Sequence, residues 1–254
     1  MNDADAGRLA LATGPAALLF VAVFLAGDRV HPLRSLVRDR RTVLSFTAGM
    51  SAAYVFLRMM PELHETRRDF VEAAEAIHEL PYEGMAIYFL ALLGFLASYG
   101  LDRLRPGREA AGAGTTEHGL ALLAKSHLLG LAAYAALTSC LLVRDAAGSV
   151  AATTLYALAF GGHFLALDHS LFEEYGAAYR RVGRWVMAGA CLLGWLAGVL
   201  LALPAFGVAL LTAFISGGVI MTNALMELAA GKDGRFLPFL AGSVLYGLML
   251  IPLG

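Results

Sequence analysis

The residues from Trp185 to Met226 read WVMAGACLLGWLAGVLLALPAFGVALLTAFISGGVIMTNALM and contain no charged side chain. A helix needs about 20 apolar residues to cross the hydrocarbon core of a bilayer. The stretch is therefore long enough for two crossings, which Pro204 separates. It lacks the alternation of barrel strands, so helices are the structure that satisfies its backbone polar groups in lipid. We predict two consecutive membrane helices here.

The composition of the whole chain extends this interpretation. Of its 254 residues 59% are hydrophobic and 15% are charged, whereas soluble domains carry about 25% charged residues. These values exclude a soluble globular protein. The net charge of −1 and the lack of a long basic cluster argue against nucleic-acid binding. Cys140 and Cys191 lie in apolar stretches and predict no disulfide framework.

Apolar windows bounded by charges, Pro or Gly predict eight membrane helices in a single transmembrane domain, residues 1–254. The windows are 9–27, 42–60, 84–101, 120–143, 149–172, 185–203, 204–226 and 236–253. Residues 62–83 form an acidic outer loop with apolar residues at helical spacing, which predicts a short amphipathic helix on the membrane surface. Residues 102–119 are rich in Gly and Ala and predict a flexible inner loop.

The distribution of basic residues predicts the orientation. Thirteen of the 19 Lys and Arg residues fall in the loops on one side and five on the other, and Lys125 lies near a helix start. Basic loops stay on the cytoplasmic side of the inner (plasma) membrane. We therefore expect both termini outside.

Two short motifs point to internal symmetry. Phe46-Thr-Ala-Gly49 and Phe214-Ile-Ser-Gly217 are each followed by apolar residues and an acidic side chain. The orientation makes their helices run in opposite directions, which is typical of inverted-repeat transporters with a central site. In window 185–203, Ala190, Gly194 and Gly198 are spaced by four and predict a close helix contact, or alternatively a homodimer face.

Ionisable groups inside membrane helices are costly to bury and therefore nominate a functional site. These groups are His127 in window 120–143 and His163, Asp168 and His169 in window 149–172. His163 and Asp168 are five residues apart and project about 140° from each other, so one helix cannot chelate an ion with both. His169 and Glu173 share a face and could hold a divalent ion together. Hydrogen-bonded packing is the competing interpretation, and we expect Asn223 to bond a neighbouring helix.

One stretch resembles a known family. Residues Ser45 to Glu62, SFTAGMSAAYVFLRMMPE, are similar to the second helix of ZIP (Zrt/Irt-like) divalent metal transporters, which runs from Ser-Phe-Ala-Ala-Gly to Leu-Pro-Glu. Eight helices, outer termini and a flexible loop after the third helix also match. The resemblance implies a 3+2+3 bundle, in which two inverted repeats of three helices flank a central pair that holds divalent metal.

The central pair differs from the family pattern. The family's fourth helix reads His-Asn-x-Pro-Glu-Gly, but here His127 is retained and Leu131 stands in place of the carboxylate. In the fifth helix Leu167 stands four residues after His163, and Asp168 is displaced by one. We therefore expect a single, weaker metal site, built from His127 and His163 together with Asp168 or His169, instead of a two-metal site.

These observations lead to a functional expectation. Imidazoles with one carboxylate suit zinc or iron better than magnesium or calcium, so we expect a ZIP-like permease with a divalent ion as substrate and no cofactor. The chain has no CxxC, GxSxG, Walker or HExxH motif, and we expect no enzyme. Two alternatives stay open: a non-transporting ZIP-like scaffold or assembly protein, and a haem protein ligated by His127 and His163.

Overall fold

The computed structural model describes residues 3–26, 40–64, 83–104, 117–145, 149–201, 204–229 and 235–251. Every regular element within these ranges is helical, which confirms the all-helical prediction. The helices are α1 (Asp3–Ala26), α3 (Arg40–Tyr54), α5 (Glu83–Arg103), α6 (Glu117–Asp145), α7 (Val150–Ala178), α8 (Arg184–Leu200), α9 (Ala205–Ala229) and α10 (Phe236–Leu250). Two π-helical turns, η1 (Val55–Met59) and η2 (Tyr179–Gly183), follow α3 and α7.

The described helices are long and apolar enough for a multi-pass membrane protein. Six stretches have the length and hydropathy of a membrane span: Asp5–Ala26, Arg41–His64, Met85–Arg103, Leu122–Val143, Val150–Leu200 and Phe206–Asn223. The longest of these contains both α7 and α8, and α10 is a shorter apolar helix. Many outward side chains are large and apolar, such as Phe89 and Leu193, as expected of a protein whose solvent is lipid.

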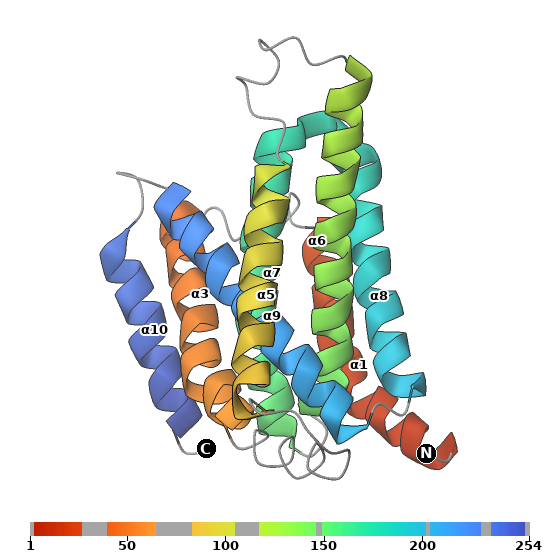
Figure 1. Ribbon diagram of the computed structural model, residues 1–254, viewed down its shortest axis with the longest axis vertical. Coiled ribbons are helices and arrows are strands. Elements are labelled where there is room, and N and C mark those ends of the chain that lie inside the picture. Colours follow the sequence, from red (N-terminus) through yellow and green to blue (C-terminus); the bar gives the residue numbers. More distant parts are fainter. Residues whose placement is uncertain are drawn as a thin grey trace.

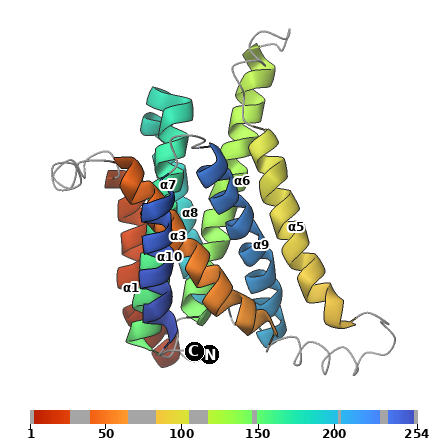
Figure 2. The same cartoon turned by 90° about the vertical axis from the view of Figure 1, so that its left-hand side faces the viewer.

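The helices stand side by side, and successive helices run in opposite directions (Figure 1). The first residues of α1 and the last residues of α10 lie at the same end of the bundle, which we call the termini end. α7 and α8 are connected at the other end, which we call the opposite end. A view at right angles shows α5 at one edge of the bundle, beside α9 (Figure 2).

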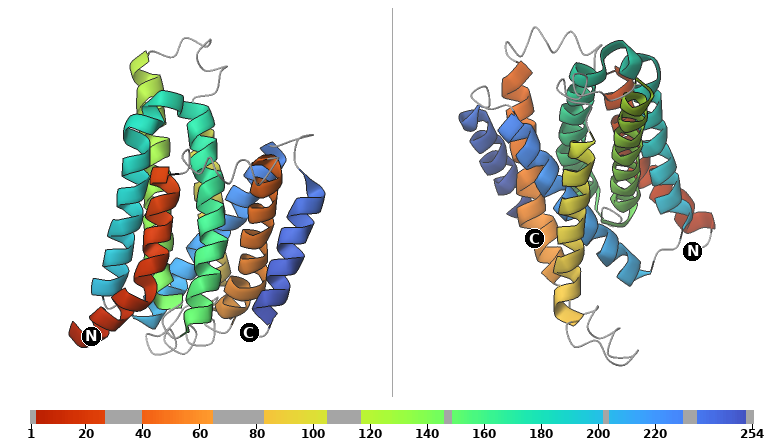
Figure 3. Two further views of the ribbon diagram at one scale, coloured as in Figure 1. Left: turned by 180° about the vertical axis from the view of Figure 1, so that it is seen from behind. Right: turned by 45° about the horizontal axis from the view of Figure 1, so that its top comes forward.

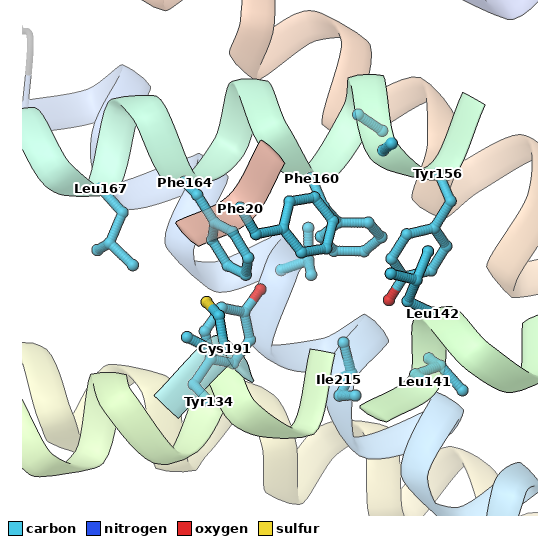
Figure 4. Close-up of a cluster of buried hydrophobic side chains, with 14 of the residues drawn as sticks. Phe20, Tyr134, Leu141, Leu142, Tyr156, Phe160, Phe164, Leu167, Cys191 and Ile215 are labelled. Atoms are coloured by element: carbon cyan, nitrogen blue, oxygen red, sulfur yellow. The ribbon is translucent and has the colours of Figure 1, made fainter. Parts of the chain in front are cut away.

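The core is aromatic where α1, α3 and α7 meet. Phe20 of α1 contacts Phe164 edge to face, with ring centroids 5.0 Å apart. Tyr156 and Phe160 of α7 stack at 4.4 Å, and Tyr54 of α3 meets both rings edge to face. The α7 rings project toward α6, which contributes Tyr134, Leu141 and Leu142 (Figure 4). The mid-section of the bundle is thus filled with side chains.

Glycines allow α3 and α10 to touch through their backbones. A Cβ atom on Gly49 would overlap the carbonyl oxygen of Phe239, and one on Gly242 would overlap the carbonyl oxygen of Phe46. The contact is reciprocal, because each helix places a glycine against a carbonyl located three residues before the partner's glycine. Small residues at such crossings let membrane helices approach closely.

The same arrangement recurs between α5 and α9. A Cβ atom on Gly94 would overlap the carbonyl oxygen of Phe214, and one on Gly217 would overlap that of Ala91. Phe214 and Gly217 are the ends of the second sequence motif, as Phe46 and Gly49 are of the first. The two motifs therefore make the same helix contact at two places in the bundle.

The predicted close contact of α8 is also confirmed. Cβ atoms on Gly194 and Gly198 would overlap the backbone of α6 at Ala136 and Cys140, so these glycines pack inside the bundle and the dimer-face alternative is wrong for them. Pro61 accounts for η1: it has no N–H for the Leu57 carbonyl, and the chain widens so that the Met60 N–H bonds the Val55 carbonyl.

Parts of the two predicted loops lie outside the described residues. These are residues 65–82 of the acidic loop 62–83, with its expected amphipathic helix, and residues 105–116 of the inner loop 102–119. The rest of the inner loop is partly helical, because α5 ends at Arg103 and α6 begins at Glu117.

Candidate functional site

Four helices contribute polar side chains to one buried cluster, which we call the central cluster: Ser51 of α3, Tyr134 of α6, His163 of α7 and Asn223 of α9. Ser51 Oγ lies 3.0 Å from Asn223 Oδ1, and His163 Nδ1 lies 3.1 Å from the same oxygen. The Tyr134 hydroxyl lies 3.2 Å from His163 Nε2. The cluster joins residues that are far apart in sequence across the middle of the bundle.

The hydrogen bonds define the state of the histidine. Because Asn223 presents its oxygen, Nδ1 of His163 donates the proton, and Nε2 accepts a hydrogen bond from Tyr134. Burial among apolar side chains favours the neutral imidazole, and in that form Nε2 is the acceptor for the Tyr134 hydroxyl. Phe160 and Phe164 flank the ring at centroid distances of 6.4 and 6.1 Å. A neutral imidazole is the form that ligates a metal ion.

Two glycines make room for the central cluster. A Cβ atom on Gly162 would lie 2.8 Å from Cβ of Thr47, so this glycine lets α3 approach α7 beside His163. A Cβ atom on Gly218 would lie 3.2 Å from the Tyr134 ring, so this glycine admits the ring against α9. The local sequence thus brings the helices together at the polar site.

One atom of the central cluster lacks a hydrogen-bond partner. Asn223 Nδ2 is buried and bonds no atom of the residues that the structure describes, although it carries two N–H donors. An unsatisfied buried polar group is costly. Rotation of the amide would place Nδ2 toward Ser51 and His163, with His163 accepting at Nδ1 in its other tautomer, and would turn Oδ1 to the side where Nδ2 now lies. The amide can therefore offer an oxygen ligand at this position.

Each of the predicted site residues contacts a polar side chain. His127 Nδ1 lies 2.7 Å from the Tyr175 hydroxyl, Asp168 Oδ1 accepts a hydrogen bond of 2.7 Å from Tyr179, and His169 Nε2 lies 3.1 Å from Glu173 Oε1. His163 belongs to the central cluster. The described residues include no group of three or more His, Cys, Asp or Glu that could hold a metal ion. Each of the four nominated residues thus has a polar contact within the bundle.

Their positions form a row along the bundle. At 1.5 Å per residue, Asp168 lies about 7.5 Å beyond His163 along α7, and Tyr175 about 18 Å beyond it. α7 runs toward the opposite end in Figure 1. His127 and Asp168 are buried, as is His163. Polar groups therefore extend from the middle of the bundle toward its opposite end.

Sequence reasoning identified His163 but missed two of its neighbours. Asn223 bonds other helices, as predicted, yet nothing in the pattern indicated His163 and Ser51 as its partners. The sequence did not mark Ser51 and Tyr134 as site residues, because Ser and Tyr are common in apolar helices. The Phe-x-x-Gly motifs were the available clue, since they mark α3 and α9, the helices that carry Ser51 and Asn223.

The central cluster offers an imidazole, an amide and two hydroxyl groups, all of them neutral ligand groups. Such a set can bind a borderline transition metal weakly, and water can complete its coordination. Its interpretation depends on this geometry, because no protein-family model, curated protein or solved structure matches the chain.

Proposed function

We propose that the protein is a ZIP-like permease that moves a divalent metal ion, zinc or iron, across the inner (plasma) membrane. The observation that supports this proposal is the central cluster, in which His163 is joined to Asn223 and Ser51 from two other helices. Intramembrane polar groups shared between helices are typical of substrate pathways. The buried amide nitrogen of Asn223 without a partner is consistent with a site that changes its contacts when an ion binds.

The proposal includes an eight-span 3+2+3 architecture. The first three spans are α1, α3 with η1, and α5; the central pair is α6 and α7; and the last three are α8, α9 and α10. The reciprocal glycine contacts support two inverted repeats, since α3 with α10 repeats the contact of α9 with α5. A central site between such repeats is the pattern of many secondary transporters. The positive-inside rule places the termini end outside.

The proposed route begins at the central cluster. There His163, Asn223 Oδ1 and Ser51 Oγ would replace part of the hydration shell of the ion. A site of neutral ligands binds weakly enough to release its ion, which conduction requires. Asp168, the one acidic side chain among the buried groups of the described residues, lies with His127 and His169 on the path toward the inner side.

Uptake of radioactive zinc or iron into proteoliposomes tests the proposal. We expect His163→Ala to reduce uptake to the level of empty liposomes. His163→Gln keeps a neutral hydrogen-bonding side chain but loses the imidazole, and it should also fail. His64→Ala is the control, because His64 is exposed and bonds Tyr88 at another place. Wild-type uptake by folded His163 variants would refute this site, and a wild-type protein without uptake would refute the permease.

The alternative is a membrane scaffold that retains the fold without transport. It is favoured by the hydrogen bonds of His127, His163 and Asp168 within the bundle and by the lack of a three-residue metal cluster in the described ranges. Metal analysis of the purified protein distinguishes the two functions. The permease is supported if the wild-type protein binds metal stoichiometrically and the His127→Ala/His163→Ala double variant has lost that metal. A metal-free protein whose melting temperature does not respond to zinc supports the scaffold.

A further inference from the structure

The connection between α7 and α8 carries a basic segment at the opposite end of the bundle. The chain turns at Gly176, which has φ 53° and ψ −122°, and the π-helical turn η2 follows. Figure 3 shows the connection lying across this end, between the ends of α7 and α8. Its exposed side chains include Arg180, Arg181 and Trp185. We call residues 180–185 the basic turn.

Packing of η2 decides which of its side chains face outward. Tyr179 is 2% exposed, and its hydroxyl donates to Asp168 at 2.7 Å. Gly183 is also buried, because the Tyr179 ring fills the space that a side chain there would need. The three residues between them are exposed: Arg180, Arg181 and Val182. The turn therefore presents two consecutive guanidinium groups and an apolar side chain on its outer surface.

The length of α7 places the basic turn at the level of the lipid headgroups. At a rise of about 1.5 Å per residue, the helical stretch from Val150 to Tyr175 is about 38 Å long. The hydrocarbon core of a bilayer is about 30 Å thick, and the headgroup regions extend this to about 40–45 Å. A helix of this length that begins at one membrane surface ends among the headgroups of the other.

The apolar side chains of the basic turn are those expected in this layer. Trp185 is 63% exposed and Val182 is 58% exposed. Tryptophan is enriched at membrane interfaces, because its ring is apolar and its N–H bonds water or headgroups. Arg181 lies four residues before Trp185 and thus on nearly the same face of the chain. The basic turn therefore combines a cation with an interfacial ring at one place.

The guanidinium of Arg180 is positioned by an aromatic ring. It lies over Phe172, 4.9 Å from the ring centroid, and the residue is exposed. This cation–π contact restricts the side chain without an N–H···O bond, so phosphate oxygens can still bind the edge of the guanidinium in bidentate geometry. The nearest acidic residues in sequence, Glu173 and Glu174, lie before the turn at Gly176, and residues 175–185 contain none. Charge complementarity therefore favours an anionic ligand.

We propose that the basic turn binds the headgroup of an anionic phospholipid such as phosphatidylglycerol. Arg180 and Arg181 bind the phosphate oxygens, and Val182 and Trp185 lie against the upper part of the acyl chains. The positive-inside rule assigns this end of the bundle to the cytoplasmic leaflet, whose anionic lipids attract basic segments. The inference requires a membrane and not the transport of a metal, so its test is independent of the permease.

Quenching of tryptophan fluorescence by brominated lipids tests the site. The chain has two tryptophans, so Trp195→Phe leaves Trp185 as the reporter beside the basic turn. The variant is reconstituted in mixtures of phosphatidylglycerol and phosphatidylcholine in which one of the two lipids carries bromine on its acyl chains. Comparison of the two mixtures gives the lipid preference at the reporter. One arginine near an anionic surface corresponds to about fivefold in affinity, so we expect phosphatidylglycerol to be preferred by about fivefold or more.

The arginines are then replaced in this background. Arg180→Gln and Arg181→Gln should each lower the preference, and the double variant should bind both lipids equally. Arg103→Gln is the matched control, because Arg103 is exposed at the same end of the bundle and also lies over a ring, 5.1 Å from the centroid of Tyr99. It belongs to α5, at another edge of the bundle (Figure 2), and its replacement should leave the preference unchanged.

The second tryptophan provides a control for position. Trp185→Phe keeps Trp195, which lies about 15 Å farther along α8, and this reporter should show no preference between the two lipids. Trp195 donates to Thr13 Oγ1 at 2.9 Å. If loss of this bond unfolds Trp195→Phe, the difference between the wild-type protein and Trp185→Phe gives the quenching of Trp185.

The outcomes separate a lipid site from general surface charge. A preference that the double variant loses and Arg103→Gln retains would support the site. Equal quenching by the two lipids at Trp185, a preference that survives in the double variant, or an equal loss in Arg103→Gln would overturn it. Replacement of chloride by inorganic phosphate at constant ionic strength should not change the preference. A loss in phosphate would assign the arginines to the free anion and overturn the lipid site.

Discussion

Asn223 on α9 and His163 on α7 meet at 3.1 Å through the amide oxygen and Nδ1, while the amide nitrogen of the same Asn223 is buried without a partner. With the amide oxygen toward His163, Nδ1 of the imidazole carries the proton, and the amide nitrogen has no hydrogen-bond partner among the described residues. A purely structural hydrogen bond would gain stability if both amide groups were paired. The unpaired amide nitrogen is therefore a cost to folding in this arrangement.

Replacement of Asn223 tests how much the central cluster contributes to stability. Asn223→Ala leaves the Nδ1 proton of His163 without an acceptor, and it should lower the unfolding free energy by about 1–2 kcal/mol. Unfolding in detergent, followed by circular dichroism, measures the change. Thr154→Ala is the control, since Thr154 is exposed and bonds the carbonyl of its own helix. An equal effect of both variants would contradict the prediction.

The glycine contacts predict matched effects at two distant positions. Gly49→Ala and Gly217→Ala each place a methyl group against a carbonyl oxygen of the partner helix. Such overpacking should cost about 1–3 kcal/mol in each case. Gly189→Ala is the control, because a Cβ atom there meets nothing within 4 Å, and the helix should gain up to about 1 kcal/mol. Thermal unfolding of the three variants in the same detergent measures their stability relative to the wild-type protein. A tolerated alanine at residue 217 would show that the second contact is looser than the first.

The turn at Gly176 predicts that a substitution there lowers stability through the backbone conformation and not through steric overlap of the side chain. Gly176→Ala forces a side chain into positive φ and should cost about 1–2 kcal/mol, although the Cβ atom has room. Gly176→Asn should cost less, because Asn tolerates this region better. Gly100→Ala is the control with equal space in a regular helix. Equal stability of Gly176→Ala and Gly100→Ala would contradict the expectation that positive φ at residue 176 strains a residue with a side chain.

The aromatic core predicts a contrast between packed and lipid-facing rings. Phe160 is 1% exposed and stacks on Tyr156, whereas Phe89 is 60% exposed on α5. Phe160→Ala should cost about 3–5 kcal/mol through the cavity that it leaves. Phe89→Ala should change stability little, since lipid replaces the ring. The yield of monodisperse protein and the melting temperature measure both variants, and equal losses would count against the described core.

The helical character of the chain could be predicted from sequence because lipid imposes it. Uncharged stretches such as 185–226 have one way to satisfy their backbone groups. Hydropathy is less informative where a helix leaves the apolar layer. The fifth window ends at residue 172, before Glu173 and Glu174, yet the helix continues past both glutamates to the turn at Gly176. A helix needs hydrogen bonds and not apolar side chains, so charge alone does not end it.

The site could be predicted only in part. His163 was found because an imidazole in an apolar helix is rare and costly. Tyr134 and Ser51 were not, since hydroxyl groups in membrane helices commonly bond their own backbone, as Thr138 does with the Tyr134 carbonyl. Whether such a side chain also reaches another helix depends on the rotation of each helix about its axis. That rotation is set by packing, above all by where glycines allow contact.

The reciprocal glycine contacts restrict how the molecule can change shape. Where the carbonyl of Phe46 lies against Gly242 and that of Phe239 against Gly49, neither helix can slide along the other without first separating from it. α5 and α9 are joined in the same way through Gly94 and Gly217. We therefore expect each pair to move as one body. Relative motion is left to the boundary between the two pairs, where the Ser51–Asn223 hydrogen bond joins α3 to α9, and to the boundary with α7, where the Asn223–His163 hydrogen bond joins α9 to α7.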